Sequence, residues 1–366
     1  MADHAQASIE ELEARYLAAR DPGEAVQAAE VLRAARSSAL GAQHPDTVMT
    51  ALAAATWRFH AGDVAGAVPE LRRLIPLAIE VLGEDDLGTL AARHIVASYP
   101  DGTAQSSAQR LVGWLELYAA EQRVLGPDHP TTLAARNQVA VLRRELGDRI
   151  GARDESAAVV EAQRRVLGDT HPDTLTGRFT AAMCLGEASD GATALAEVEA
   201  LIPLLGAAFG YDHQNTLAAR QTSALWTLES AGDPLDRVSD WEVLVEDLTR
   251  ALGDQHPLTV AATQTRAEQR SLWQQQEPEE GAGLLAAVVE AKRVVGRALR
   301  DDGPESGTYL RCRFDLAQRF LRGQDLDAAR RHAESLVADS SAILGDDHEL
   351  TLAARRLLAD IAAWPR

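Results

Sequence analysis

Apolar residues recur at helical intervals along most of the chain, and residues 130–167 show the pattern clearly. The first apolar positions of this segment fall on one face of a helix: Leu133, Val139, Leu142 and Leu146. Gly147-Asp148 interrupts the pattern, and a second apolar stripe follows over residues 152–167. The segment therefore predicts two amphipathic helices in succession, joined by a short turn.

The joint before this helix pair is itself a repeated unit. Residues 125–136 read LGPDHPTTLAAR, and close copies recur with their threonines at Thr47, Thr89, Thr132, Thr174, Thr216, Thr259, Thr308 and Thr351. The steps between these threonines are 42, 43, 42, 42, 43, 49 and 43 residues. A fixed period of this size predicts a solenoid of stacked helix pairs.

The residue types in the joint have backbone reasons to be there. Gly126 can adopt the left-handed conformation that ends a helix, and Pro130 suits the first position of the next helix, where a missing N–H costs nothing. The same glycine stands at Gly41, Gly83, Gly168, Gly210, Gly253 and Gly345. Each joint should therefore end one helix and start another.

These motifs resemble tetratricopeptide repeats of the longer, kinesin-light-chain type. The resemblance rests on Gly-Asp-x-x-x-Ala at the turns, as in Gly62 to Ala67 and Gly147 to Ala152, and on Leu-Gly-x-x-His-Pro-x-Thr-Leu between pairs. It covers residues 41–355. It implies an all-α, right-handed superhelical solenoid of antiparallel helix pairs whose first helices line a concave groove, and family members generally bind peptides or proteins there. It implies no activity.

We expect about eight helix pairs plus a C-terminal capping helix in one continuous array. Residues 1–40 should form an N-terminal capping pair, and residues 41–276 the regular array, with a degenerate unit at 83–125 whose first helix is cut short by Tyr99-Pro100-Asp101-Gly102. Residues 277–307 read as an acidic loop and an irregular joint. Residues 308–366 should hold the final pair and the capping helix.

Composition and charge favour some classes of binding partner over others. The formal net charge is −19 and aromatic residues make up only 4% of the chain, which disfavours binding to nucleic acid and to anionic membrane surfaces and favours basic or amphipathic protein partners. The N-terminal segment lacks a signal-peptide pattern and no apolar run approaches a membrane span, so we expect a cytoplasmic protein. The strong preference for Arg over Lys is typical of GC-rich bacterial genomes.

The sole lysine, Lys292, lies outside any phosphate-binding glycine loop, which excludes a P-loop nucleotide hydrolase. Schiff-base chemistry would need this one amine. The sequence indicates no cofactor and no metal site. Six histidines occupy one repeated position of the joint, about one repeat apart, so a structural role is expected for them: His44, His129, His171, His213, His256 and His348.

Arginines also recur, four residues after the joint threonine, and ion pairs with neighbouring helices are favoured over ligand binding: Arg93, Arg136, Arg178, Arg220 and Arg355. Variable first-helix positions are the candidates for the binding groove. They are Phe59, His60, His94, Asn137, Arg144, Phe179, Met183, Gln221, Gln264, Glu268, Arg313 and Phe320. They lack the repeated Lys and Asn of a carboxylate clamp, so an apolar or helical ligand is favoured.

Three interpretations remain open. The first is a non-enzymatic scaffold that binds a protein or peptide in the groove. The second is a solenoid adapted to a small molecule, as a sensor or an enzyme, with a pocket near Phe59, His60 and His94. The third is an assembly component that associates with itself through its end helices.

Overall fold

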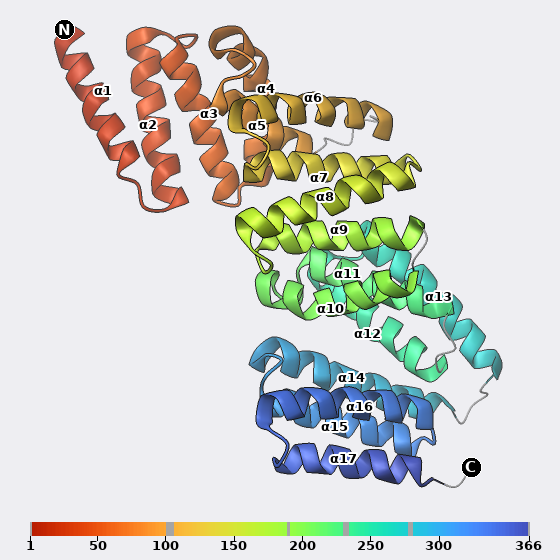
Figure 1. Ribbon diagram of the computed structural model, residues 1–366. Coiled ribbons are helices and arrows are strands. Elements are labelled where there is room, and N and C mark those ends of the chain that lie inside the picture. Colours follow the sequence, from red (N-terminus) through yellow and green to blue (C-terminus); the bar gives the residue numbers. More distant parts are fainter. Residues whose placement is uncertain (1, 100–105, 189–190, 230–233, 277–280, 365–366) are drawn as a thin grey trace. The chain divides into compact units, whose positions relative to one another are not determined.

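The computed structural model describes residues 2–99, 106–188, 191–229, 234–276 and 281–364. Within these ranges the chain forms seventeen α-helices and one short 3-10 helix, with no strand. Within each of the chain's two compact units, most successive helices pack as antiparallel neighbours, and α13 (Pro257–Gln276) and α14 (Gly281–Asp302) are the exception (Figure 1). The predicted class, an all-α array of TPR-like helix pairs with one unpaired helix at the C-terminal end, is confirmed.

The helices fall into two compact units, residues 1–169 and residues 170–366, where the sequence predicted one continuous array. Unit 1 contains α1 (Ala2–Leu17), α2 (Pro22–Leu40), α3 (Pro45–His60), α4 (Val64–Leu82), α5 (Leu87–Ser98), α6 (Ser107–Leu125), α7 (Pro130–Glu145) and α8 (Arg149–Leu167). Unit 2 contains α9 (Pro172–Ala188), α10 (Gly191–Phe209), α11 (Gln214–Trp226), the 3-10 turn η1 (Thr227–Glu229), α12 (Pro234–Leu252), α13 (Pro257–Gln276), α14 (Gly281–Asp302), α15 (Gly307–Arg322), α16 (Leu326–Leu344) and α17 (Glu349–Ala362).

The joint between pairs is built as the sequence indicates, with one difference in its backbone. Gly126 ends α6 with a φ of 92° and a ψ of 163°. The positive φ was predicted, but the ψ differs from the value of about +47° of the left-handed helical region. The conformation belongs instead to a region that is essentially restricted to glycine. The joint therefore requires glycine more strictly than a left-handed cap would.

The turn between the two helices of a pair has a different cap, formed by an aspartate after a glycine. Gly147 has a φ of 82°, and Asp148 caps α8 by accepting the N–H of Gly151 through Oδ1 at 2.9 Å. Asp63 and Asp325 cap α4 and α16 in the same way. Since an aspartate oxygen satisfies a helix donor that has no intrahelical partner, the Gly-Asp motif marks the start of each of these second helices.

The alignment of the last pair on Thr308 was wrong by one residue. Gly303 has the positive φ of a joint glycine, and Ser306, three residues later, caps α15 by accepting the N–H of Tyr309 at 3.1 Å. Tyr309 therefore takes the place that Thr132 has in α7. Thr308 is accordingly exposed, whereas Thr132 is buried.

The same shift applies at the turn between α15 and α16. Gln324, with a φ of 63°, is the only non-glycine residue with a positive φ in the described part of the chain. It stands where Gly147 stands in the earlier pair, directly before the capping aspartate Asp325. Glycine is the usual residue at such a position, and here Gly323 stands one residue earlier.

The region 277–307, where an acidic loop and an irregular joint were expected, contains a long helix between the two. Residues 277–280 lie outside the described residues, but α14 already begins at Gly281 and continues to Asp302. The longer repeat step comes from helix length, since α13 has 20 residues and α14 has 22, against 16 in α7 and 19 in α8. In the degenerate unit α5 is short, with 12 residues, as predicted; residues 100–102 of the expected breaker lie outside the described residues.

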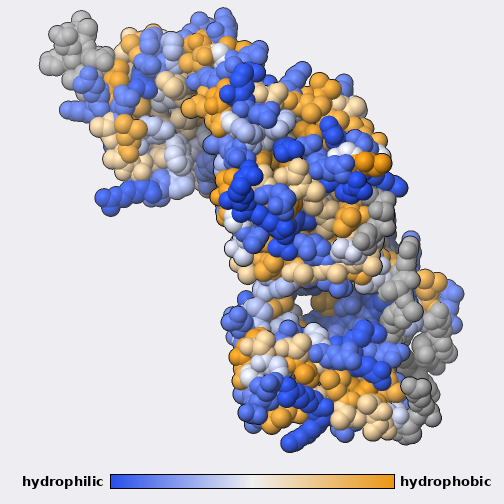
Figure 2. All heavy atoms as spheres, in the orientation of Figure 1, coloured by the Kyte–Doolittle hydropathy of each residue, from blue (hydrophilic) through white to orange (hydrophobic). Residues whose placement is uncertain are grey.

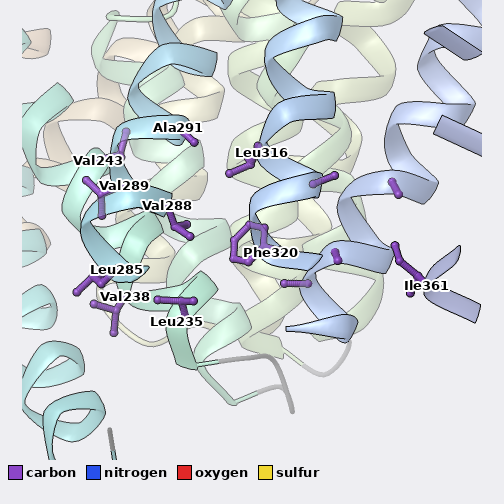
Figure 3. Close-up of a cluster of buried hydrophobic side chains, with 14 of the residues drawn as sticks. Leu235, Val238, Val243, Leu285, Val288, Val289, Ala291, Leu316, Phe320 and Ile361 are labelled. Carbon is purple, nitrogen blue, oxygen red and sulfur yellow. The ribbon is translucent and has the colours of Figure 1, made fainter. Parts of the chain in front are cut away.

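Helix α13 departs from the regular packing. The other first helices of unit 2 pack closely against their own second helices, whereas α13 packs against α12, and α14 packs against α12 and α15. The largest apolar cluster joins these elements through side chains such as Leu235 and Val238 of α12, Val288 of α14, and Phe320 of α15 (Figure 3). Unit 2 is therefore held together through α12 and α14.

Helix α10 corrects one expectation from composition. It is long and apolar enough to span a bilayer, with a mean hydropathy of 1.5 over 18 residues, so an apolar run of membrane-span character does exist. The helix lies against α9 and α11. Its residues Val198, Leu201 and Leu205 are fully buried in an apolar cluster.

Candidate functional site

The histidines of the joint are helix caps. Nδ1 of each accepts the backbone N–H two residues later at 3.2 or 3.3 Å: His44, His129, His171, His213, His256 and His348. This requires an unprotonated Nδ1, so the neutral imidazole is the capping form. Burial lowers the pKa of His213, which favours that neutral form. The structural role predicted for these residues is thus confirmed.

The repeated arginines and threonines also belong to the framework. Arg178 of α9 donates through Nε to Glu197 of α10 at 2.8 Å, and Arg136 pairs with Glu155 nineteen residues later in the same geometry. The hydroxyl of Thr216 donates to the carbonyl of Gly210 at 2.9 Å. Arg136 and Arg178 therefore hold the two helices of a pair together, and Thr216 ties the start of α11 to the joint before it.

The predicted groove residues differ in exposure. Six are half-buried: Phe59, His94, Arg144, Phe179, Met183 and Arg313. Three are exposed: His60, Gln264 and Glu268. Three are buried: Asn137, Gln221 and Phe320. The assignment of Phe320 to a groove surface was wrong, because its ring is fully buried and stacks on His332 at a centroid distance of 5.0 Å.

The two groove histidines do not form one site. His94 Nδ1 lies 2.9 Å from Oε1 of the buried Glu121, and its ring meets the edge of Trp114. His60 instead packs edge-on against Phe59 and Trp57. Each histidine thus has its own partners, and the described residues contain no group of three or more His, Cys, Asp or Glu side chains that could hold a metal ion.

The clearest concavity lies in unit 2, where the sequence indicated no pocket. A hollow of about 510 Å³ is enclosed by α10, α11, α12, α14, α15 and α16, and the space-filling view shows the surface hollowed between α10 and α14 (Figure 2). One wall is apolar and includes Ile202, Val295 and Leu316. The hollow adjoins the place where α14 packs on α12 instead of pairing with α13.

One end of the hollow is built around a buried carboxylate. Asp247 of α12 is 3% exposed and accepts from three arginines: from Arg220 Nη1 at 2.9 Å, Arg250 Nη2 at 2.8 Å and Arg300 Nη1 at 3.2 Å. Arg220 and Arg300 also line the hollow. Since arginine remains protonated, this cluster presents more positive than negative charge to the cavity.

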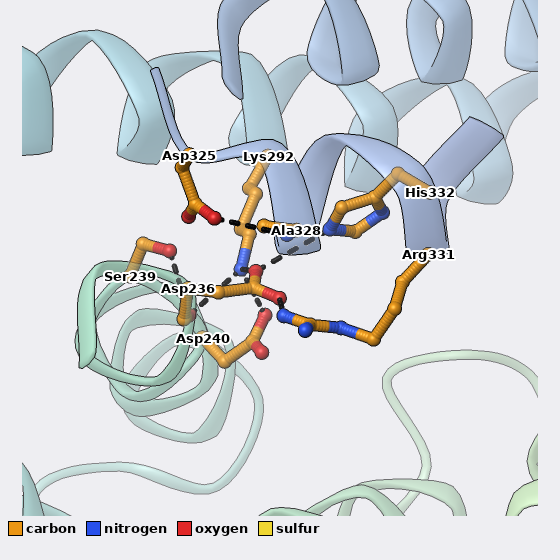
Figure 4. A network of polar contacts seen from close by, with 8 residues as sticks. All are labelled: Asp236, Ser239, Asp240, Lys292, Asp325, Ala328, Arg331 and His332. Atoms are coloured by element: carbon orange, nitrogen blue, oxygen red, sulfur yellow. Dashed lines mark hydrogen bonds and ion pairs between the residues drawn. The ribbon is translucent and has the colours of Figure 1, made fainter. Parts of the chain in front are cut away.

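A second charged cluster ties α12 to α14 and α16 (Figure 4). Lys292 Nζ lies 2.6 Å from Asp236 Oδ1 and 2.6 Å from Asp240 Oδ1. Arg331 Nη2 and His332 Nε2 approach the same Asp236 at 2.9 and 3.3 Å. Lys292, Asp240 and His332 also line the hollow.

Burial and neighbouring charges shift the pKa values of this cluster in different directions, and burial raises the pKa of Asp240. Burial opposes the charged form of Lys292, but the neighbouring Asp240 and Asp236 outweigh it and raise the pKa of the amine. Burial likewise opposes the carboxylate of Asp236, but Lys292 and His332 outweigh it and lower its pKa. Lys292 is therefore a protonated bridge, and an amine in that state is not a nucleophile.

Tyr211 forms another part of the lining. It stands in the joint between α10 and α11, and its ring lies so close to Gly206 that a β-carbon there would come within 2.2 Å of it. Its hydroxyl is buried and has no hydrogen-bond partner among the described residues, and burial raises its pKa. A buried phenol of this kind is a donor available to a bound molecule or to water.

Comparison with known proteins finds one family model and several solved structures similar to part of the chain. A tetratricopeptide repeat family model matches residues 132–173, which run from the start of α7 to the start of α9. Two solved structures similar to the chain are of nearly identical TPR-like repeats from a Podosopora anserina protein described as a putative kinesin light chain, one of them a variant with a single substitution. Their identities are 19% and 20%, with TM-scores of 0.38 and 0.37. The matches cover 56% and 55% of this chain and 96% of each other chain.

No curated protein matches the chain. The family match identifies the segment from α7 to the start of α9 as similar to a tetratricopeptide repeat.

Proposed function

We propose that the chain is a non-enzymatic scaffold that binds a protein or peptide through the first helices of its pairs. The observation that supports this most directly is the use of the repeated residues. The shared histidines cap helices, shared arginines such as Arg178 pair with acidic residues of the neighbouring helix, and the joint threonines other than Thr308 are buried. The first-helix positions that vary from pair to pair are then the ones free to differ with the ligand.

The chemistry of the partner follows from charge and from these variable positions. With a net charge of −19, the surface attracts basic segments over a distance of about 8 Å at physiological ionic strength. Phe179 and Met183 of α9 are half-buried, whereas Gln264 and Glu268 of α13 are exposed. A basic or amphipathic helical segment, with an apolar stripe beside polar residues, suits such a surface.

Site-specific photo-crosslinking in a lysate of the cells that produce the protein tests the proposal. The crosslinker p-benzoyl-phenylalanine replaces His60 or Gln264, exposed on first helices in units 1 and 2. The matched controls are Glu161 and Glu199, exposed on second helices of the same two units. We expect a first-helix position to crosslink one defined polypeptide that the second-helix controls do not, and the yield of this product to fall as the salt concentration is raised.

Equal crosslinking from first and second helices, or no polypeptide product from either, would refute the use of the first-helix surface. If the captured polypeptide is the chain itself, light scattering over a concentration series should show a dimer mass, and the scaffold would then work by self-association.

A further inference from the structure

The hollow in unit 2 has the size and lining of a ligand site. Its volume of about 510 Å³ lies within the range of about 300–1,000 Å³ typical of small-molecule pockets. We infer that it binds a small organic acid, a single carboxylate on an apolar body, with the carboxylate against Arg220 and Arg300 and the apolar body along α14 and α15. This inference is independent of the scaffold function.

The charge of the side chains that line the hollow favours an anionic ligand. The lining contains four permanent cations, Arg220, Lys292, Arg300 and Arg313, and three carboxylates, Asp240, Asp247 and Asp339. The hollow is therefore locally positive within a chain of net charge −19. Each of these carboxylates already accepts from a lining cation, so a cationic ligand would have to compete with a bond that exists.

The surplus of positive charge is small and lies at one end of the hollow. Arg220, Arg250 and Arg300 share Asp247, and Arg250 also reaches Asp212 Oδ1 at 2.7 Å. Three guanidinium groups thus face two carboxylates, which leaves one positive charge. A monoanion balances it, whereas a phosphate dianion would exceed it beside a buried carboxylate.

Donor geometry favours a carboxylate. The described bonds of Arg220 and Arg300 to Asp247 both run through Nη1, and the planar guanidinium has further donors arranged in a fork that matches a carboxylate. The buried hydroxyl of Tyr211 is another donor in the lining with no partner among the described residues. A ligand carboxylate would satisfy it, and leaving such a group unsatisfied is unfavourable.

The rest of the ligand is apolar. Val295 and Leu299 of α14, Leu316 of α15 and Ile343 of α16 line the same hollow. Gly296 lies among them, and a β-carbon built on it meets only the end of Arg300, at 3.6 Å. A β-carbon at residue 296 would therefore fit, and a larger side chain there would occupy part of the hollow.

Thermal-shift and calorimetric titrations of the full chain test the inference with octanoate as the probe. Octylamine and 1-octanol are the matched probes, with the same apolar body and a positive or neutral head, and octyl phosphate supplies the dianion. We expect octanoate to bind and to raise the melting temperature, and the three other probes to bind at least about tenfold more weakly, as expected for the loss of one charge-assisted bond.

Two substitutions locate the site. Gly296→Leu should abolish octanoate binding while the protein stays folded, and Gly113→Leu, at an exposed helical glycine of unit 1 with open space around it, should leave binding unchanged. Arg300→Gln should weaken octanoate about ten- to a hundredfold. Arg178→Gln, which removes a framework ion pair outside the hollow, should leave the affinity as it was.

Titration with a short peptide shows whether the bound carboxylate belongs to a small organic acid or to a peptide terminus. If a short apolar peptide with a free C-terminal carboxylate binds and its amide does not, while octanoate is not bound, the carboxylate belongs to a peptide terminus and the proposed chemistry stands. The inference is overturned if neither acid binds at millimolar concentration, if octylamine binds as tightly as octanoate, or if Gly296→Leu retains full affinity.

Discussion

Replacing Gly126 with alanine isolates the backbone requirement of the joint. Gly126 has a φ of 92° and a ψ of 163°, and an added β-carbon would find no heavy atom within 4 Å. Packing therefore contributes nothing to the effect of the substitution. Any loss of stability must come from forcing an L-residue into a conformation that is essentially restricted to glycine.

The expected magnitude follows from two opposing terms. Holding a non-glycine residue in such a conformation costs about 1–3 kcal/mol, and the reduced entropy of the unfolded chain returns about 0.4–1 kcal/mol. We expect a net loss of about 1–2 kcal/mol. Gly113→Ala is the matched control, because Gly113 is exposed within α6 and also has open space around it. It should stabilise the protein by about 0.5–1 kcal/mol.

Urea unfolding followed by circular dichroism at 222 nm measures both changes. The transition that carries the effect should be that of unit 1, which contains both glycines. A third variant, Gly126→Asn, tests the ψ angle, because asparagine tolerates the left-handed helical region but not this one. Equal stabilities of the Gly126→Ala and Gly113→Ala proteins, or wild-type stability of Gly126→Asn, would show that the joint does not have this backbone.

Three further predictions concern unit 2. Lys292→Met should destabilise the protein by about 3 kcal/mol, near the lower limit for breaking a buried pair, because Asp236 keeps Arg331 and His332 as partners; a loss below about 1 kcal/mol in urea unfolding would contradict a buried bridge. Burial lowers the pKa of the His213 cap below its unfolded value of 6.5. The stabilising effect of this group is therefore present above pH 6.5 and is lost as pH falls through the folded pKa. In His213→Asn the cap does not titrate, so the difference in the free energy of unfolding between pH 7.5 and pH 5.5 should be smaller than in the wild-type protein. Gln324→Gly should raise the melting temperature, since it relieves a positive φ of 63° at a gain of about 1 kcal/mol, and an unchanged melting temperature would speak against strain at that turn.

The sequence predicted most where the physical reason is local. Gly126, Pro130 and Gly147 mark the ends and starts of helices because each has a backbone preference that acts within a few residues. The framework role of the repeated arginines was also foreseeable, since a side chain at the same place of each repeat lies in similar surroundings in each pair. Arg178 and Glu197 show that partner.

Errors arose where one local signal was ambiguous. Thr308 and Gly323 resemble joint and turn residues, but Ser306 and Gln324 serve as the cap and the positive-φ residue of this pair. The shift displaced the predicted groove positions of α15. Burial of Phe320 could have been suspected only from the packing of α14, α15 and α16 around it.

The hollow could not be predicted, because it depends on which helices pack together rather than on any one of them. The sequence shows neither that α14 packs on α12 nor that Arg220, Arg300 and Asp247 meet across separate helices. One signal was available, namely the singular Lys292 in a chain otherwise rich in arginine. Asp236 and Asp240, four residues apart on one helix face, are the complementary half of that signal.

The buried lysine has a practical consequence for following the opening of unit 2. Acylating reagents attack neutral amines, whereas the Lys292 side chain is 7% exposed and its ε-amine is shared by two carboxylates. Its acetylation by such a reagent should therefore proceed only in molecules in which α12 and α14 have separated. The sequence contains no other lysine side chain. The rate at which the fragment containing residue 292 gains the mass of an acetyl group therefore reports the rate of that separation, without an engineered label.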